Sequence, residues 1–156
     1  MFGGTQDNGS NGGPSRTDME HGIRNADWFK TLFADGHDSA TDPEYTDIIY
    51  AETQQGGLHR VDRASGEQVF IQPQAGEGED YERYNWDAPI EISPHSPSRI
   101  YFASQRVWRT DNRGDSWTPI SDDLTRDQER ITLDIRGKQK SWDNPWDVNA
   151  MSNYNT

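Results

Sequence analysis

The sequence contains no cysteine, few aliphatic residues and few positive charges. Because cysteine is absent, disulfides and thiolate metal sites are excluded, and the redox compartment stays open. No apolar run approaches the length that is needed to span a bilayer. Asp and Glu number 27 against 15 Lys and Arg, which gives a net charge of -12. A nucleic-acid partner is therefore disfavoured, since phosphate binding needs a basic face.

The beginning of the sequence lacks the features of a secretory signal. MFGGTQDNGS has neither a basic n-region nor an apolar h-region. If the parent protein is exported, we expect its signal to lie outside this sequence.

The apolar content is low for a chain that is long enough to form one domain. Only 30% of the 156 residues are hydrophobic. Leu, Ile, Val and Phe together fall below the roughly 20% at which a strongly charged chain begins to look disordered. Six Trp, six Tyr and five Phe residues argue against disorder. Aromatic and β-branched residues favour strands, so the sequence predicts a folded all-β protein with long polar loops.

Three segments of the chain are similar to one another. They read FGGTQDNGS at 2–10, DIIYAETQQGGLHRVDRASGEQVFI at 47–71 and SRIYFASQRVWRTDNRGDSWTPI at 98–120. Thr53 follows Thr5 at an offset of 48 residues. Repeats of about 40–50 residues are typical of four-stranded propeller blades. A β-sandwich is the nearest alternative, but it does not predict the repeat.

The third segment and the residues before it predict four short strands. Apolar and β-branched residues concentrate at 89–93, 99–103, 106–109 and 117–120, and turn residues separate these runs. Such spacing is typical of an antiparallel all-β domain. We expect the first run to be the innermost strand of a blade and the last to be the outermost.

Residues 110–117 read TDNRGDSW and contain the Arg-Gly-Asp tripeptide of integrin-binding signals. They also fit the turn pattern S/T-x-D-x-G-x-x-W, which Thr110 begins and in which Asn112 replaces the central Asp. The Asn112 side chain can bond backbone amides of its own turn, and Gly114 can adopt a positive φ. Trp117 is expected to pack beneath the turn. We predict a structural turn rather than an adhesion signal, with the Arg and Asp of the tripeptide at variable positions.

Four strings carry a resemblance to a known family. GGTQDNGS, IIYAETQQGGLHRVD, YNWDAPIEISPHSPSRIYFASQRVWRT and GDSWTPISDDLTR resemble bacterial Asp-box (BNR-repeat) proteins that carry the label glycosyl hydrolase. These proteins are related to the propeller of sortilin and vacuolar sorting receptors. The resemblance covers nearly the whole chain and implies a fragment of a larger β-propeller.

The resemblance also implies an arrangement of blades and a location. We expect about three four-stranded blades, two of them incomplete, at 1–33, 34–73 and 74–121 of one propeller domain. Residues 122–156 would cross into the next blade. The remaining blades of the parent propeller are implied partners, and the implied location is secreted, periplasmic or at the cell surface.

In a propeller, the loops between blades and the loops between second and third strands lie on one face. Here that face would hold three repeated glutamines and the loop 72–88. The candidate ligand-binding residues are Gln6, Gln54, Gln105, Arg83, Asn85 and Trp86. Polar groups mixed with aromatic rings suit a protein or carbohydrate ligand. The alternatives are that the glutamines brace neighbouring loops and that Trp86 fills a seam between blades.

No catalytic residue, cofactor or metal site follows from the sequence. Carboxylates cluster at Asp35 and Asp38, at Glu77 and Glu79, and at 122–123, but glycoside hydrolysis needs a defined separation that sequence does not give. Residues 35–38 with Asp42 offer oxygen ligands without the spacing of an EF-hand loop. Three functions stay open: a non-catalytic propeller that binds protein or glycan, a sialidase- or xyloglucanase-like glycoside hydrolase, and a purely structural domain of a larger surface protein.

Overall fold

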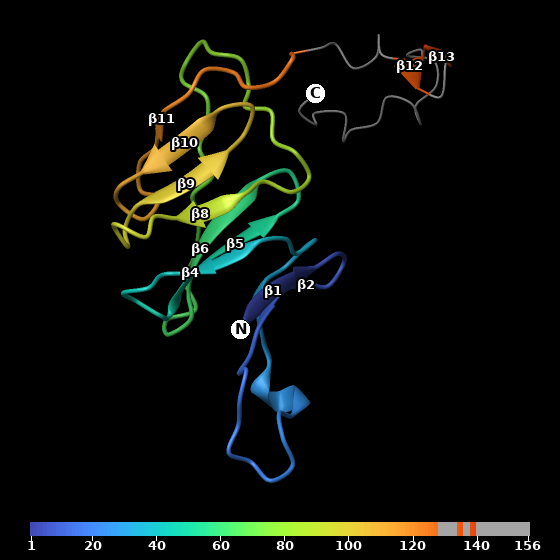
Figure 1. Ribbon diagram of the computed structural model, residues 1–156, viewed down its shortest axis with the longest axis vertical. Coiled ribbons are helices and arrows are strands. Elements are labelled where there is room, and N and C mark those ends of the chain that lie inside the picture. The colour runs from blue at the N-terminus through green and yellow to red at the C-terminus, as the bar shows by residue number, and fades with distance from the viewer. Residues whose placement is uncertain (128–133, 136–137, 140–156) are drawn as a thin grey trace.

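The computed structural model describes residues 1–127, 134–135 and 138–139 (Figure 1). Within these residues the chain is all-β and has no α-helix; a short 3-10 turn, η1 (Asn25–Asp27), is its one helical element. Three antiparallel sheets of three, four and four strands follow one another along the chain and do not close into a ring. A separate pair, β12 (Asp134–Ile135) and β13 (Lys138–Gln139), follows them. The expected crossover at 122–156 lies largely outside the described residues.

The first sheet, sheet A, consists of β1 (Phe2–Thr5), β2 (Gly9–Gly12) and β3 (Phe29–Leu32) in that order. Strands β1 and β2 are rich in glycine. The rings of Phe2 and Phe29 meet edge to face with centroids 6.1 Å apart. A long excursion, residues 13–28, separates β2 from β3 and carries η1. Sheet A has three strands, one fewer than each of the two sheets that follow it.

The second sheet, sheet B, is a four-stranded meander. Its strands are β4 (Ser39–Thr41), β5 (Ile48–Thr53), β6 (Gly57–Asp62) and β7 (Gln68–Phe70). Strand β5 reads IIYAET and is buried along most of its length. Because side chains alternate along a strand, Ile49 and Ala51 face one side, whereas Tyr50 faces the other. The two sides join different hydrophobic clusters, so sheet B lies between two apolar layers.

The third sheet, sheet C, repeats this meander with β8 (Ile90–Ile92), β9 (Ile100–Ala103), β10 (Val107–Thr110) and β11 (Thr118–Pro119). All four expected strands between residues 89 and 120 are confirmed, in the expected order. The hairpin of β9 and β10 pairs Phe102 with Trp108 and Tyr101 with Arg109. The all-β prediction and the four-stranded antiparallel sheets are thus correct.

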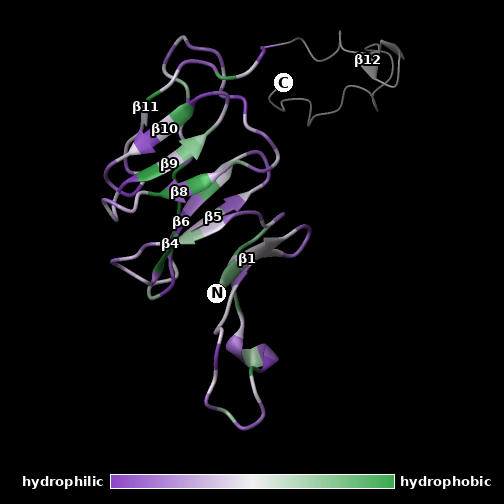
Figure 2. Cartoon of the chain, viewed as in Figure 1, coloured by the Kyte–Doolittle hydropathy of each residue, from purple (hydrophilic) through white to green (hydrophobic). Residues whose placement is uncertain are grey.

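Hydrophobic stretches appear in strands such as β8, β9 and β10, whereas the loops are mostly hydrophilic (Figure 2). The buried apolar side chains form two clusters between the sheets. Leu32, Ile49, Ala51 and Val61 form the layer between sheets A and B, against Phe2 and Phe29. A larger layer joins sheets B and C and contains Tyr50, Leu58, Ile71, Tyr84, Ala88, Ile90, Ile100 and Phe102. Strand β4 lies beside both β1 and β8, so the leading strands of the three sheets are neighbours. A chain of low overall hydrophobicity can therefore still form two apolar layers, one between sheets A and B and one between sheets B and C.

Candidate functional site

Sheets B and C have two ends with different connections. We call one end the loop end: it carries the β5–β6 and β9–β10 hairpins and the long loops 33–38 and 71–89. We call the other end the turn end: it carries the β4–β5, β6–β7 and β10–β11 turns. The division follows from the alternation of antiparallel strands in a meander.

The repeated glutamines lie at the loop end, where two of them brace loops. The side-chain oxygen of Gln54 accepts a bond from the backbone N–H of Asp35 at 3.1 Å. That of Gln105 accepts one from the N–H of Arg83 at 2.8 Å. Each glutamine thus holds the loop that leads into its own sheet, rather than a loop of a neighbouring sheet. Gln6 is exposed, and its carbonyl accepts a bond from the Asn8 amide at 3.3 Å.

The other candidates for ligand binding are also at the loop end, and each has an intramolecular contact. The Arg83 guanidinium bonds the Asp123 carboxylate at 2.5 Å and the Asp127 carboxylate at 3.1 Å. Asn85 is exposed, and its side-chain oxygen accepts the N–H of Trp86 at 2.8 Å. The half-buried Trp86 ring meets His37 edge to face at 6.1 Å. The structure therefore brings the sequence-predicted residues to one end, but it uses several of them to hold loops.

A buried carboxyl group at the loop end was not predicted from the sequence. Glu52 is 0% exposed, and one of its oxygens accepts the N–H of Ala88 at 2.6 Å, while the other has no hydrogen-bond partner within the described part of the chain. Burial, reinforced by the charges of Asp87 and Asp38, raises the pKa of Glu52 to about 8. Glu52 is thus protonated at neutral pH. Its one sequence signal is an acidic residue within the buried strand IIYAET.

Near Glu52, a histidine and an aspartate join the two long loops. His37 Nδ1 contacts the carboxylate of Asp87, and the backbone N–H of His37 donates to the Glu52 carbonyl at 3.2 Å. The loop that leads into sheet C is therefore fastened to the loop that leads into sheet B. His37 is buried and Asp87 is exposed, so the contact between them holds the two loops together at the surface.

Each carboxylate pair considered for catalysis has at least one member with a structural partner. The Asp35 carboxylate accepts the N–H of Asp7 at 2.8 Å, and Asp38 caps the N–H of Ser39 at 2.8 Å. Glu79 pairs with Arg106 at 2.9 Å. Hydrogen bonds from Thr125, aided by Arg83, lower the pKa of Asp123 to about 2. Asp123 therefore stays ionised and is unsuited to donate a proton.

The oxygen ligands considered for a cation are likewise engaged. The Asp42 carboxylate accepts bonds from the N–H groups of Glu44 and Tyr45, both at 2.9 Å, and from the Tyr50 hydroxyl at 3.2 Å. Across the part of the chain that the structure describes, no three His, Asp or Glu side chains lie where they could hold a metal ion together.

At the turn end, residues 110–117 form a tight turn with the geometry of the pattern. The Thr110 hydroxyl oxygen accepts the N–H of Gly114 at 3.0 Å, and the Asn112 side-chain oxygen accepts that of Ser116 at 3.0 Å. Gly114 has φ +92, and a Cβ there would strike the side chain of Ile71. The indole N–H of Trp117 donates to the Ile71 carbonyl at 2.7 Å. The turn is thus held internally and fastened to the end of sheet B.

The Arg and Asp of the tripeptide, at the variable positions of the pattern, form contacts with sheet B that were not predicted from the sequence. Arg113 reaches across to sheet B and bonds Asp42 at 2.7 Å and Glu44 at 2.6 Å. In the other direction, Arg60 of sheet B donates to the Arg113 carbonyl and to the Asp115 carboxylate, both at 2.8 Å. These positions look variable along the sequence, but their partners lie in another sheet.

The electrostatics of this bridge concentrate on a buried carboxylate. Asp42 is 0% exposed. Burial raises its pKa, but hydrogen bonds from Arg113 and from the amides of Tyr45 and Glu44 outweigh burial and hold the pKa below its usual value. The same contact to Asp42 raises the pKa of Arg113. Both groups are therefore charged at neutral pH.

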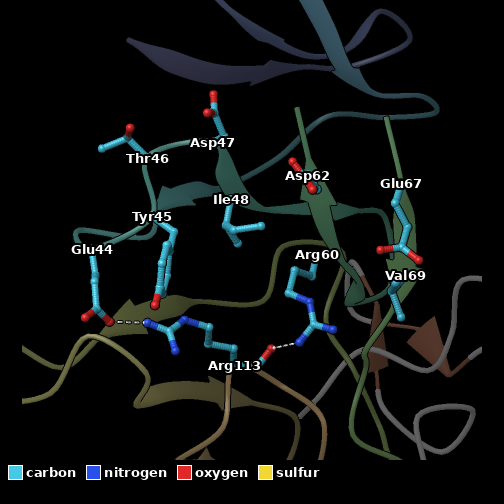
Figure 3. A pocket seen from close by; sticks show the side chains of 10 residues that line it. All are labelled: Glu44, Tyr45, Thr46, Asp47, Ile48, Arg60, Asp62, Glu67, Val69 and Arg113. Atoms are coloured by element: carbon cyan, nitrogen blue, oxygen red, sulfur yellow. Dashed lines mark hydrogen bonds and ion pairs between the residues drawn. The ribbon is translucent and has the colours of Figure 1, made fainter. Parts of the chain in front are cut away.

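An open cavity of about 630 Å³ lies at the turn end, between sheet B and the 110–117 turn (Figure 3). Charged side chains surround an aliphatic floor. The lining residues are Glu44, Tyr45, Thr46, Asp47, Ile48, Arg60, Asp62, Glu67, Val69 and Arg113. Sequence reasoning placed the functional face at the other end and did not anticipate this cavity.

No helix among the described residues is both long and apolar enough to cross a membrane. Comparison of the chain with protein-family models, with curated proteins and with solved structures found no match.

Proposed function

We propose that the chain is a segment of a β-propeller of the Asp-box, sortilin-like kind, and that it serves outside the cytoplasm as a non-catalytic scaffold for a protein or glycan. The observation that carries this proposal is the recurrence of the same local geometry at the repeat distance. Thr5 Oγ1 donates to the Gly9 carbonyl at 3.2 Å, and Thr53 Oγ1 donates to the Gly57 carbonyl at 3.3 Å. The two threonines are 48 residues apart.

Further positions repeat in the same way. Asp7 and Gln55, also 48 residues apart, have positive φ values of 66 and 61. Gly66 and Gly114 show the same offset of 48 residues and have φ values of 80 and 92. Such agreement in turns of different sequence supports a repeated structural unit, as repeat architectures require. The neighbouring leading strands β1, β4 and β8 support a radial arrangement of blades.

The loop end is the proposed binding surface. The loop 71–89 carries the exposed Asn85 and Tyr81, of which Tyr81 is 91% exposed. An exposed ring beside amide groups suits stacking and hydrogen bonding to a sugar or a peptide. The bond from the Arg83 N–H to Gln105 holds this loop in position, which lowers the entropy cost of binding.

A ligand screen on the full-length parent tests the proposed surface. Tyr81→Ala and Asn85→Ala should each weaken binding to the best ligand of a glycan or peptide array without lowering the melting temperature. Ile23→Ala, in the excursion 13–28, is the matched exposed control and should bind normally. Unchanged binding by both loop variants would contradict the assignment of the loop end.

Sedimentation tests the propeller segment separately. A piece of a ring exposes unpaired strand edges and uncovered faces, so the isolated chain should form concentration-dependent oligomers and melt broadly. A clean monomer with a sharp two-state transition would contradict the propeller proposal.

A glycoside hydrolase is the second candidate, and the protonated carboxyl of Glu52 favours it. A raised pKa is what a general acid needs, and two carboxylates, Asp38 and Asp87, influence that pKa. Glu52 is sealed from solvent, so hydrolysis would require the loops to open. Activity of the parent on aryl glycosides that Glu52→Gln abolishes would replace the scaffold proposal with this one.

A further inference from the structure

The turn-end cavity contains two arginines, and both already have anionic partners. Arg113 is paired with Asp42 and Glu44 at 2.7 and 2.6 Å. Arg60 is paired with Asp115 at 2.8 Å. Neither guanidinium is left to attract an anion, so the cavity is not an anion site.

At the β6–β7 turn, the lining of the cavity carries two carboxylates, Asp62 and Glu67, that form no ion pair with the described residues. Asp62 and Glu67 face each other across the β6–β7 turn, where the Asp62 N–H donates to the Glu67 carbonyl at 2.9 Å. Among the residues that the structure describes, the donors to the Asp62 carboxylate are neutral: Ala64 at 2.8 Å and Ser65 at 2.8 Å. Among the described residues, the Glu67 carboxylate has no cationic partner. A ligand with a positive group would supply the missing charge.

The rest of the cavity suits the stem of a long basic side chain. Ile48 and Val69 form its floor and continue into the apolar layer between sheets B and C. Tyr45 forms a wall, and the Arg113 guanidinium lies 4.6 Å from the centre of its ring. An arginine from another sheet thus already lies in this cavity, stacked on an aromatic ring and bonded to carboxylates (Figure 3). Cation–π contact and burial of the methylene stem are the two ways in which such side chains gain from this environment.

We propose that the cavity binds a lysine or arginine side chain of a peptide ligand, with its charged group at Asp62 and Glu67 and its stem on Ile48 and Val69. The net charge of -12 adds long-range attraction for a basic peptide. The site lies at the turn end, so it is separate from the loop-end surface of the proposed function. Either can fail without the other.

The test is an NMR titration of the isotopically labelled full-length parent with small probes. The tripeptides Gly-Lys-Gly and Gly-Arg-Gly should bind with a Kd of about 1 mM, the affinity expected of a single anchored side chain. Amide shifts should change around 44–48, 60–69 and Arg113. The tripeptide with norleucine, which keeps the stem and lacks the charge, should bind at least about tenfold more weakly.

Two variants that each remove one negative charge test where the peptide binds. Glu67→Gln should weaken Gly-Lys-Gly binding by about threefold, as expected for a partly exposed ion pair. Glu77→Gln, at an exposed position outside the cavity, should leave the Kd unchanged. Unshifted amides elsewhere in the Glu67→Gln spectrum check that the fold is intact.

Several results would overturn the proposal. They are equal binding of the norleucine and lysine tripeptides, equal effects of the two variants, and shifts outside the cavity or none at all. Tighter binding of butylamine than of Gly-Lys-Gly would overturn the assignment to a peptide, since it would show that the backbone opposes binding.

Discussion

Sheets B and C are joined at both ends by a fully buried carboxyl group, and the two groups are in opposite states. Asp42, at the turn end, has Arg113 beside it and a pKa below its usual value. Glu52, at the loop end, has neighbouring carboxylates and a pKa raised to about 8. Neither side chain is exposed to water, but burial is the largest cause of the raised pKa of Glu52, whereas the cation beside Asp42 and its amide donors outweigh burial there. The turn end is held by an ion pair and the loop end by a neutral carboxyl group.

The largest effect is expected from the residue that positions the turn-end ion pair. Gly114→Val places a β-branched side chain at φ +92 and drives it into Ile71. Backbone strain and overpacking together should lower the free energy of unfolding by about 4 kcal/mol. Urea denaturation of the full-length parent measures this loss. Gly66→Val, at φ +80 with open space around it, is the control and should cost less.

Removal of the cation is the next largest change. Arg113→Ala leaves Asp42 buried without its counter-charge and should cost about 3 kcal/mol, since a buried carboxylate then lacks compensation. Arg109→Ala, whose pair with Asp111 is exposed, should cost at most about 1 kcal/mol. If the two variants melt alike, Asp42 does not depend on Arg113.

At the loop end, removing the carboxyl group is expected to stabilise the fold at neutral pH. Folded Glu52 keeps its proton up to about pH 8, whereas the unfolded chain releases it near 4.5. The stabilisation from this proton is therefore complete below 4.5 and is lost as pH rises through that window. Each pKa unit corresponds to about 1.4 kcal/mol, and the unsatisfied amide that glutamine introduces offsets part of the gain. We expect Glu52→Gln to be about 2 kcal/mol more stable at pH 7.

The pH dependence of this variant provides its own control. Wild type and Glu52→Gln should differ in unfolding free energy at pH 7 and converge or cross at pH 4. A constant difference from pH 4 to pH 8 would show that Glu52 does not titrate in this window.

The smallest effect should come from the second charge of the tripeptide. Asp115 is 63% exposed, and its pair with Arg60 is screened by water. Asp115→Ala should change the unfolding free energy by about 0.5 kcal/mol. A loss as large as that of Arg113→Ala would mean that the two halves of the bridge act as one unit.

The sequence was informative where structure depends on neighbours along the chain. Alternating apolar residues and turn residues located all four strands of sheet C, and the pattern around Gly114 located a tight turn. The matching Thr-Gln pairs pointed to the hairpins whose glutamines lie at the loop end. Each of these features depends on a few consecutive residues.

The sequence was uninformative where the partner is remote. Arg113 meets Asp42 across 71 positions, and Arg60 meets Asp115 across 55. Nothing local marks these pairs in a chain with 27 acidic residues. The turn-end cavity is missed for the same reason, since its walls come from different sheets. The state of Glu52 likewise depends on Asp87 and Asp38, which other loops deliver.

Sheet B, with an apolar layer on each face, sets the order in which the molecule should open. Amide hydrogens exchange with solvent only when their hydrogen bonds break, and the slowest ones report the last structure to unfold. Strand β5 pairs on both edges, with β4 and β6, and is covered above and below. Its amides should outlast those of sheets A and C, so that deuterium enters the chain from its two outer sheets toward the middle.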